Sequence, residues 1–243
     1  EELRSLGVEA LSFDAGAYPE RGHLSIEGGG IRLGRRGLPP LRSAYVRALG
    51  THPLTPGFEP DLQSRPRGLI AQCDEKRALL ESFLLGLERQ GVRLVNGIEA
   101  NAQHDRKPLQ LARLTEAGAP VPRWLATNDP REVRRFAREV GRLVYKPLAG
   151  GAIVQELLPE DLSKERLEAL RTAPVLFQEY VAGVAVRAYV VGRRVVAAAE
   201  IHSEELDYRR GETAVEPTRL SPAERRYALC AARACGMTFA GVD

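Results

Sequence analysis

The sequence predicts a mixed α/β (α+β) fold, because helix and strand patterns alternate along its first two thirds and an antiparallel sheet pattern follows. Residues 74–90 place leucine and phenylalanine on one helical face, and an apolar strand follows at residues 92–95. Residues 184–191 and 194–201 flank a Gly-Arg turn, which is the pattern of a β-hairpin. Together these observations favour sheets covered by helices.

The other elements are predicted in chain order from strand runs and helix-capping signals. Short strands are expected at residues 8–13, 31–33, 44–46, 124–126, 143–145, 175–180 and 238–243. One helix should end before Gly118, and a basic helix should follow the capping residue Asn128 or Asp129. A capping box from Ser221 to Glu224 predicts a further helix near the end of the chain.

Composition and charge exclude several classes of protein. The chain has 243 residues, of which 44% are hydrophobic and 28% charged, and this balance excludes a disordered protein. No apolar run approaches the roughly 20 residues that cross a bilayer, and a net charge of +3 gives no support for nucleic-acid binding. The three cysteines fit no metal or redox motif, so we expect reduced thiols in a cytoplasmic protein.

Both ends of the sequence suggest a longer natural chain. The sequence starts at Glu1, and its one methionine is Met237, so we expect the natural start to lie upstream. The last predicted strand stops at Asp243, so we expect that strand to continue beyond the final residue.

Lysine is rare in this chain, and one lysine stands before a glycine loop. Only four of the 35 basic residues are lysine, which suggests that those retained supply a compact charge. Lys146 follows the strand at residues 143–145 and precedes Gly150 and Gly151. The backbone N–H groups of such a loop can approach a phosphate, whose charge the ammonium neutralises. Taken alone, the same stretch fits a hairpin turn after a surface lysine equally well.

A second polar stretch, Gln178-Glu-Tyr-Val181, lies on the next predicted strand, and Arg187 follows on the strand after it. Successive side chains of a strand point to opposite faces, so Glu179 should face away from Gln178 and Tyr180. Taken alone, this stretch reads as an ordinary edge strand.

Together these features resemble, in their order and spacing, the ATP-grasp superfamily. Along the chain they are Lys107, Lys146, Gly150-Gly151, Gln178-Glu-Tyr-Val181, Arg187 and Gly241-Val-Asp243. The chain is most similar to the RimK-like branch, and within it to the ATP-grasp maturases of ribosomally made peptides (graspetide or microviridin type). The resemblance implies an ATP-grasp fold with an N-terminal pre-ATP-grasp domain at 1–100, a central and small domain at 101–177, and an incomplete C-terminal domain at 178–243.

The resemblance also implies a role for each of these residues. ATP would be bound by Lys107, Lys146, Gly150, Gly151, Gln178, Glu179, Tyr180 and Val181. The catalytic candidates are Arg187 and Arg209, the substrate carboxylate would be bound by Asp207 and Arg209, and Asp243 would be a ligand of Mg²⁺. We expect Asp207 and Arg209 to lie on one side of an extended segment, two residues apart.

The chain departs from the family pattern at two points. An acidic residue that contacts the ribose usually stands two positions before the arginine, and Ala185 occupies that position here. The glutamate and asparagine that usually complete the magnesium site are expected beyond Asp243.

The implied function is that of an ATP-dependent ligase with ATP and Mg²⁺ as cofactors. It would join a carboxylate to an amine or a hydroxyl through an acyl phosphate, on a ribosomally made peptide. Two alternatives stay open: a RimK-like amino-acid ligase acting on a protein or metabolite, and a nucleotide-binding module without turnover, which Ala185 would suit. The expected partner is a peptide or small carboxylate, with no membrane, and a homodimer stays open.

Overall fold

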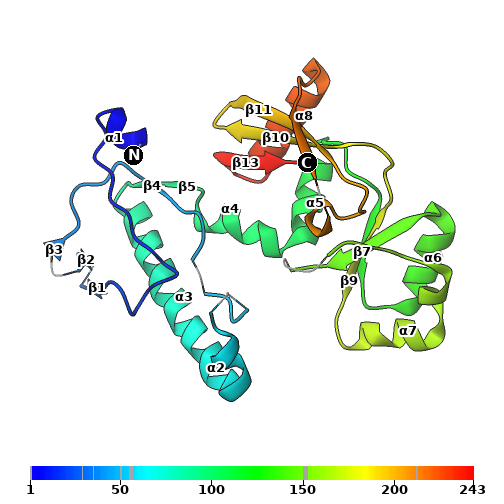
Figure 1. Cartoon of the computed structure of the whole chain (residues 1–243), viewed down its shortest axis with the longest axis horizontal. Coiled ribbons are helices and arrows are strands. Elements are labelled where there is room, and N and C mark those ends of the chain that lie inside the picture. Colours follow the sequence, from blue (N-terminus) through cyan, green and yellow to red (C-terminus); the bar gives the residue numbers. More distant parts are fainter. Residues whose placement is uncertain are drawn as a thin grey trace. The chain divides into compact units, whose positions relative to one another are not determined.

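The computed structural model describes residues 2–28, 30–34, 36–49, 51–54, 57–149, 153–211 and 213–243 (Figure 1). The chain divides into two units, Glu1–Ile98 and Glu99–Asp243. None of the described helices is both long and apolar enough to cross a membrane. The division into three domains at 1–100, 101–177 and 178–243 stays a prediction.

The first unit is built on one long helix, α3 (Pro66–Arg89), which confirms and extends the helix predicted at residues 74–90 (Figure 1). Its apolar face packs in a core of Tyr18, Leu24, Leu80, Phe83, Leu84, Leu87, Val92 and Leu94. The strands β4 (Ser43–Tyr45) and β5 (Arg93–Val95) pair in parallel on either side of α3 in the sequence. This strand–helix–strand unit is the α/β layer that the sequence predicted.

Shorter elements complete the first unit. They are α1 (Glu2–Ser5), α2 (Glu59–Ser64), and the antiparallel strands β1 (Leu24–Glu27), β2 (Gly30–Leu33) and β3 (Arg36–Gly37). The strand predicted at residues 8–13 is wrong, because the backbone there is irregular and Val8 and Leu11 are exposed. An apolar run becomes a strand only when another strand pairs with it.

The second unit contains a four-stranded antiparallel sheet, which we call the small sheet. Its strands lie in the order β6 (Trp124–Thr127), β9 (Val175–Glu179), β7 (Leu143–Pro147) and β8 (Gln155–Glu156). The helices α6 (Pro130–Val140) and α7 (Lys164–Glu168) cover one face, where their side chains pack against Leu143 and Phe177 (Figure 1). Strand alternation therefore turns Lys146 and Gln178 toward the opposite face.

A second four-stranded antiparallel sheet, the large sheet, carries the hairpin. Its order is β12 (Ala214–Pro217), β11 (Arg194–His202), β10 (Ala185–Val191) and β13 (Phe239–Val242). The helix α8 (Pro222–Ala234) covers one face, and its alanines pack against Ala188 and Val190. The β10–β11 register shifts between Tyr189 and Val190, which marks a β-bulge opposite them.

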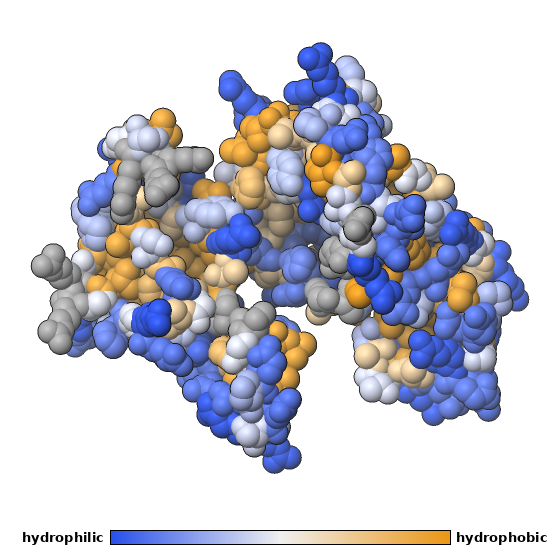
Figure 2. Space-filling model, in the orientation of Figure 1, coloured by the Kyte–Doolittle hydropathy of each residue, from blue (hydrophilic) through white to orange (hydrophobic). Residues whose placement is uncertain are grey.

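The remaining elements outside the two sheets are helical. They are α4 (Ile98–Ala102), α5 (Lys107–Glu116) and the 3₁₀ turns Gln103–Asp105, Pro159–Leu162, Ala169–Arg171 and Tyr208–Arg210. The buried Gln103 side chain donates from Nε2 to the Cys235 carbonyl at 2.7 Å, which joins the start of α5 to the end of α8. Figure 2 shows apolar side chains gathered over the β10–β11 hairpin, where Tyr189, Val191 and Val196 are exposed.

The capping box at the start of α8 gives a prediction of stability. The Ser221 hydroxyl accepts from the Glu224 N–H at 3.2 Å, and the Glu224 carboxylate accepts from the Ser221 N–H at 2.7 Å. Ser221→Ala should lower the free energy of unfolding by about 1 kcal/mol, because a terminal N–H loses its acceptor. Urea denaturation measures this loss. Ser82→Ala is the control, since the exposed Ser82 hydroxyl donates within α3 to Ala78 O and caps no helix; equal losses in both variants would contradict the prediction.

Candidate functional site

A cavity of about 550 Å³ in the second unit lies among both sheets, α5 and α8. Its size falls in the range of about 300–1,000 Å³ typical of small-molecule sites. The polar side chains in its wall are Gln110, Lys146, Gln178, Glu224, Tyr227 and Asp243. The rest of the wall is mainly apolar, with Leu111, Val186, Ala188, Met237 and Val242 among its members. A mainly apolar cavity with a few convergent polar groups is the usual form of a ligand site.

Lys146 and Gln178 enter this cavity from neighbouring strands of the small sheet. The pairs Lys146↔Leu176 and Val144↔Gln178 put the two side chains on the same face, one step apart along the strands. Gln178 is only 7% exposed, and Leu176 beside it is fully buried. This part of the cavity wall is thus apolar apart from an amide and an ammonium, which lie near each other.

Lys107 approaches the same region from the first turn of α5. Its Nζ donates to the Leu148 carbonyl at 3.1 Å, just before the predicted phosphate loop. Gly150 and Gly151 lie outside the described residues. The structure therefore brings Lys107 to the segment that follows Lys146, although 41 residues separate Lys107 from Leu148 in the sequence.

The predicted adenine segment leaves the end of β9. The Glu179 N–H donates to Arg123 O at 2.9 Å, and the Glu179 carboxylate accepts from the Arg123 N–H at 3.2 Å. The Tyr180 N–H donates to Arg142 O at 3.0 Å, and Val181 is 65% exposed. The carboxylate of Glu179 thus bonds to the neighbouring strand of its own sheet, and the roles of Glu179, Tyr180 and Val181 in adenine binding stay predictions.

Arg187, Tyr208 and Asp243 form one hydrogen-bonded cluster on the large sheet. Arg187 Nε and Nη2 donate to the two oxygens of Asp243 at 2.5 and 2.7 Å, and Nη2 also contacts the Tyr208 hydroxyl oxygen at 2.7 Å. The hydrogen bonds to Asp243 raise the pKa of Arg187, which keeps the guanidinium charged. The predicted catalytic arginine and the predicted metal ligand are therefore direct partners.

Tyr208 is the functional candidate that the sequence reasoning missed. The signal was its place between Asp207 and Arg209, the two residues chosen from that motif. A tyrosine offers both an apolar ring and a hydroxyl, so it can accept a hydrogen bond from a guanidinium and also pack against it. Here the Arg187 guanidinium carbon lies 5.7 Å from the Tyr208 ring centroid.

The expectation of an extended segment at Asp207 and Arg209 is wrong. Tyr208–Arg210 forms a 3₁₀ turn, so the two residues do not lie along one side of a strand. Asp207 is 5% exposed, and its Oδ2 accepts from the Val154 N–H at 3.0 Å. The side chain of Arg209 lies outside the described part of the chain. Asp207 therefore contacts the segment that leaves the glycine loop, and its role in substrate binding stays a prediction.

The described residues can supply only some of the ligands that a magnesium ion needs. Among them, no three His, Cys, Asp or Glu side chains are close enough to hold a metal. Magnesium is usually bound by one or two carboxylates together with phosphate oxygens of a substrate and water. Asp243, a carboxylate in the wall of a cavity that also holds Lys146, fits one such place.

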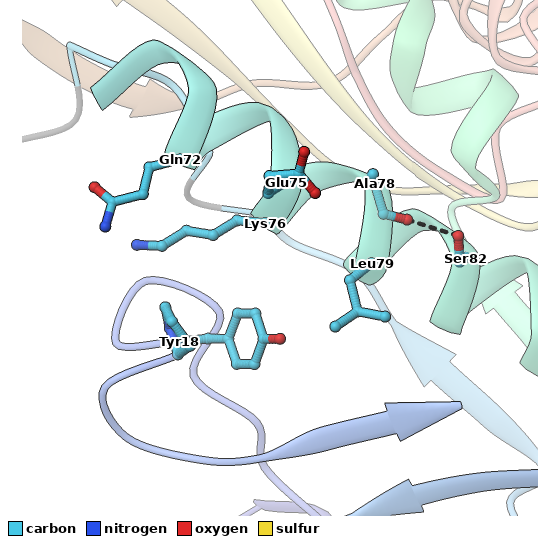
Figure 3. Close-up of a pocket in the computed structure, with 8 residues that line it drawn as sticks. Tyr18, Gln72, Glu75, Lys76, Ala78, Leu79 and Ser82 are labelled. Carbon is cyan, nitrogen blue, oxygen red and sulfur yellow. Dashed lines mark hydrogen bonds between the residues drawn. The ribbon is translucent and has the colours of Figure 1, made fainter. Parts of the chain in front are cut away.

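A second cavity, of about 530 Å³, lies within the first unit (Figure 3). One wall is the face of α3 that carries Gln72, Glu75, Lys76 and Leu79, and Tyr18 stands opposite. Lys76 Nζ lies 5.1 Å from the ring centroid of Phe58, so this ammonium contacts an aromatic face. None of the residues predicted to bind ATP or substrate lines this cavity.

Comparison with known sequences supports the ATP-grasp interpretation. A family model for the RimK-like ATP-grasp domain matches residues 105–243. A probable alpha-L-glutamate ligase of Marinobacter nauticus is 32% identical over 179 residues, which is 68% of this chain and 58% of that protein. A second one, of Shewanella amazonensis, is 32% identical over 64% of this chain and 56% of its own length. The chain thus spans little more than half the length of these curated relatives.

Solved structures match nearly the whole chain. The ATP-grasp ligase PsnB, complexed with a phosphomimetic variant of a minimal precursor, Mg and ADP, is 37% identical with a TM-score of 0.87, over 98% of this chain and 78% of its own. PsnB complexed with precursor peptide PsnA2 and AMPPNP is 34% identical with a TM-score of 0.80, over 99% and 76%. The macrocyclase MdnC of Microcystis aeruginosa, bound with precursor peptide MdnA, shares the fold at 22% identity and a TM-score of 0.78, over 99% and 80%. These matches confirm the ATP-grasp fold predicted from the order of motifs.

Proposed function

Because this chain belongs to the RimK-like ATP-grasp family, we propose that it is part of an ATP-dependent ligase that modifies a ribosomally made peptide. The bond formed would join a carboxylate to an amine or a hydroxyl. The observation that carries this proposal is the cavity in which Lys146 and Gln178 of the small sheet meet Asp243 at the end of the large sheet. The PsnB complexes with precursor, Mg and ADP support the choice of ligands.

The lysines would hold the phosphates of ATP. Lys146 supplies a compact positive charge within the cavity wall, and Lys107 sits beside the loop that follows it. Negative charge grows on the oxygens of a transferring phosphoryl group, so a cation fixed in advance lowers the barrier. Magnesium, when bound with Asp243 as one ligand, would neutralise further charge on the phosphate oxygens.

The reaction would proceed in two steps. The substrate carboxylate attacks the γ-phosphorus of ATP and releases ADP, which leaves an acyl phosphate. An amine or hydroxyl then attacks the acyl carbon, loses its proton and expels phosphate. Arg187 donates from Nε and Nη2 to Asp243, so its third nitrogen, Nη1, is the donor suited to orient the carboxylate or the acyl phosphate. Asp207 and Arg209 would help to bind the substrate.

The nucleobase would meet the backbone at Val181 rather than at Tyr180. A hinge recognises adenine through backbone donors and acceptors, and the N–H groups of Glu179 and Tyr180 already donate to Arg123 and Arg142. The next N–H along the segment belongs to Val181, whose side chain is exposed.

Selectivity at the ribose should be weak. Ala185 begins β10 and offers no carboxylate to the sugar hydroxyls, and the Glu179 carboxylate already accepts from Arg123. A site without a hydrogen-bonding partner cannot strongly reject an analogue that lacks the hydroxyl. ATP and dATP should therefore bind within about tenfold of each other in calorimetry.

A much larger preference for ATP would contradict this prediction. Glu224 is then the acid to test, because its side chain lies in the cavity wall. Glu224→Gln would remove that preference if Glu224 contacts the ribose.

The proposed function is tested with the full-length protein, ATP, Mg²⁺ and a candidate precursor peptide rich in Thr, Ser, Glu and Asp. Each bond formed within the peptide should lower its mass by one water while ATP is converted to ADP and phosphate. Arg209→Ala should lose this product and retain ATP affinity if Arg209 serves the substrate. An unchanged peptide, with no ATP consumed, would count against ligase activity and favour a nucleotide-binding module.

A second candidate, an amino-acid ligase, is favoured by the 32% identity to probable alpha-L-glutamate ligases. The same assay separates the two, because the addition of an amino acid raises the mass of the acceptor. The proposal also includes a cytoplasmic location, consistent with the three free cysteines. The homodimer stays a prediction, which light scattering would test.

A further inference from the structure

Arg142 contacts Tyr180, the residue that enters the proposed nucleotide hinge, in two ways. Its carbonyl accepts from the Tyr180 N–H at 3.0 Å, and its guanidinium carbon lies 3.7 Å from the centroid of the Tyr180 ring. Arg142 stands between Gly141, which ends α6, and the first residue of β7. One residue therefore holds both the backbone and the side chain of Tyr180.

Glu156 of β8 binds the edge of the Arg142 guanidinium. Arg142 Nε and Nη2 donate to the two carboxylate oxygens of Glu156 at 2.6 and 3.0 Å. These hydrogen bonds raise the pKa of Arg142 and lower the pKa of Glu156, so both groups stay charged. A bidentate pair sets the plane of a guanidinium, and a planar cation set over a ring attracts its π face. Glu156 at the edge of the guanidinium and Tyr180 under its face thus form one connected group with Arg142, which we call the hinge clamp.

The exposure of the hinge clamp argues for a positional role. The Arg142 and Glu156 side chains are 56% and 33% exposed, and ion pairs this accessible contribute little to global stability. The segment that follows Tyr180 has few packing contacts of its own, since Val181 and Val184 are 65% and 54% exposed. The contacts of Tyr180 therefore determine the position of the first residue of this segment.

We propose that Arg142 is a positioning residue that holds the hinge in the conformation that binds the nucleotide, and that it acts through Tyr180 rather than by touching ATP. This inference rests on the proposed function, because it takes residues 180–181 as the nucleotide hinge. When the binding-competent conformation is only partly populated, apparent affinity falls by the same fraction. Loss of the clamp should therefore weaken nucleotide binding without unfolding the protein.

The experiment compares Arg142→Ala, Arg142→Lys and Arg135→Ala in the full chain. Arg135→Ala is the matched control, since Arg135 makes equally short ion pairs to Glu132 and Glu139 on α6. Calorimetry measures ATP affinity, hydrogen exchange follows the Tyr180 amide, and thermal unfolding reports stability. Arg142→Ala should weaken ATP binding about tenfold and speed exchange at Tyr180, with an unfolding midpoint like that of the control. Arg142→Lys keeps a positive charge for Glu156 but loses the planar group over the Tyr180 ring. Its affinity for ATP should therefore fall between that of Arg142→Ala and that of Arg135→Ala.

Two outcomes separate failure of the clamp from failure of the proposed function. If the unsubstituted chain binds ATP and Arg142→Ala binds it equally well, with unchanged exchange at Tyr180, the clamp is overturned. If the unsubstituted chain binds no ATP, the proposed function fails and the link to nucleotide affinity fails with it. The rate of hydrogen exchange at the Tyr180 amide in the variants still reports directly whether Arg142 holds that residue in place.

Discussion

Replacing Lys146 with alanine should weaken ATP binding by about 10- to 100-fold. Lys146 lies in the wall of the cavity beside the buried Gln178, and its ammonium is the charge that the small sheet supplies there. Loss of a charge-assisted hydrogen bond costs about 1.5–3 kcal/mol, which is the source of that range. Isothermal titration of the variant with ATP and Mg²⁺ measures the change.

Lys164→Ala is the control for this prediction. Lys164 is an exposed residue in the first turn of α7, a helix that packs on the opposite face of the small sheet. Its removal should leave ATP affinity unchanged. Equal ATP affinities for the Lys146 variant and the unsubstituted protein would show that Lys146 does not bind the phosphates.

Replacing Arg187 with methionine should reduce product formation by 100-fold or more while the protein stays folded. Arg187 joins Asp243 and Tyr208, so its loss takes the cation from the carboxylate that we propose as a magnesium ligand. Removal of one preorganised donor that stabilises developing charge typically costs about 10²- to 10³-fold in rate. Methionine fills a similar volume without charge, so the effect should lie in turnover.

Product formation per unit time, at saturating ATP, is the measurement for Arg187→Met. Arg194→Ala is the matched control, because Arg194 is an exposed arginine at the start of the neighbouring strand β11. Turnover in the Arg187 variant equal to that of the control would show that the cluster is structural and does not take part in the reaction.

Local pattern made Lys146 a candidate and the family resemblance added Gln178, whereas long-range pairing brought the site residues together. The alternation within each strand fixes which of its own residues share a face, but Lys146 and Gln178 lie on one face of the sheet only because β7 pairs with β9 in this register. The contact between Arg187 and Asp243 depends on β10 pairing with β13, in the register Ala188↔Val242. Sequence order alone does not specify which strands become neighbours, so the pairing appeared only in the fold.

The two wrong predictions share a cause. Residues 8–13 form an apolar run and Asp207 and Arg209 stand two positions apart, and each of these local patterns predicts an extended chain. An extended segment needs hydrogen-bond partners from elsewhere. At Tyr208–Arg210 the backbone forms a local 3₁₀ turn instead, and Asp207 accepts from Val154, 53 residues away in the sequence. Resemblance to a family identified these residues as candidates, but it did not determine their conformation.

The bulge in the β10–β11 hairpin divides that hairpin into two independent registers. On the tip side, Val190 pairs with Val195, and on the other side Tyr189 pairs with Ala197, so Val196 is the extra residue. A bulge absorbs a one-residue change in strand length, which would otherwise turn every following side chain to the opposite face. The extra residue on the β11 side is therefore absorbed at Val196 and does not alter the pairing Arg187↔Ala199. The register of β10 with β13, from Ala188↔Val242 to Val191↔Phe239, runs past the bulge without a shift, so the alignment of Arg187 with Asp243 does not depend on the extra residue in β11.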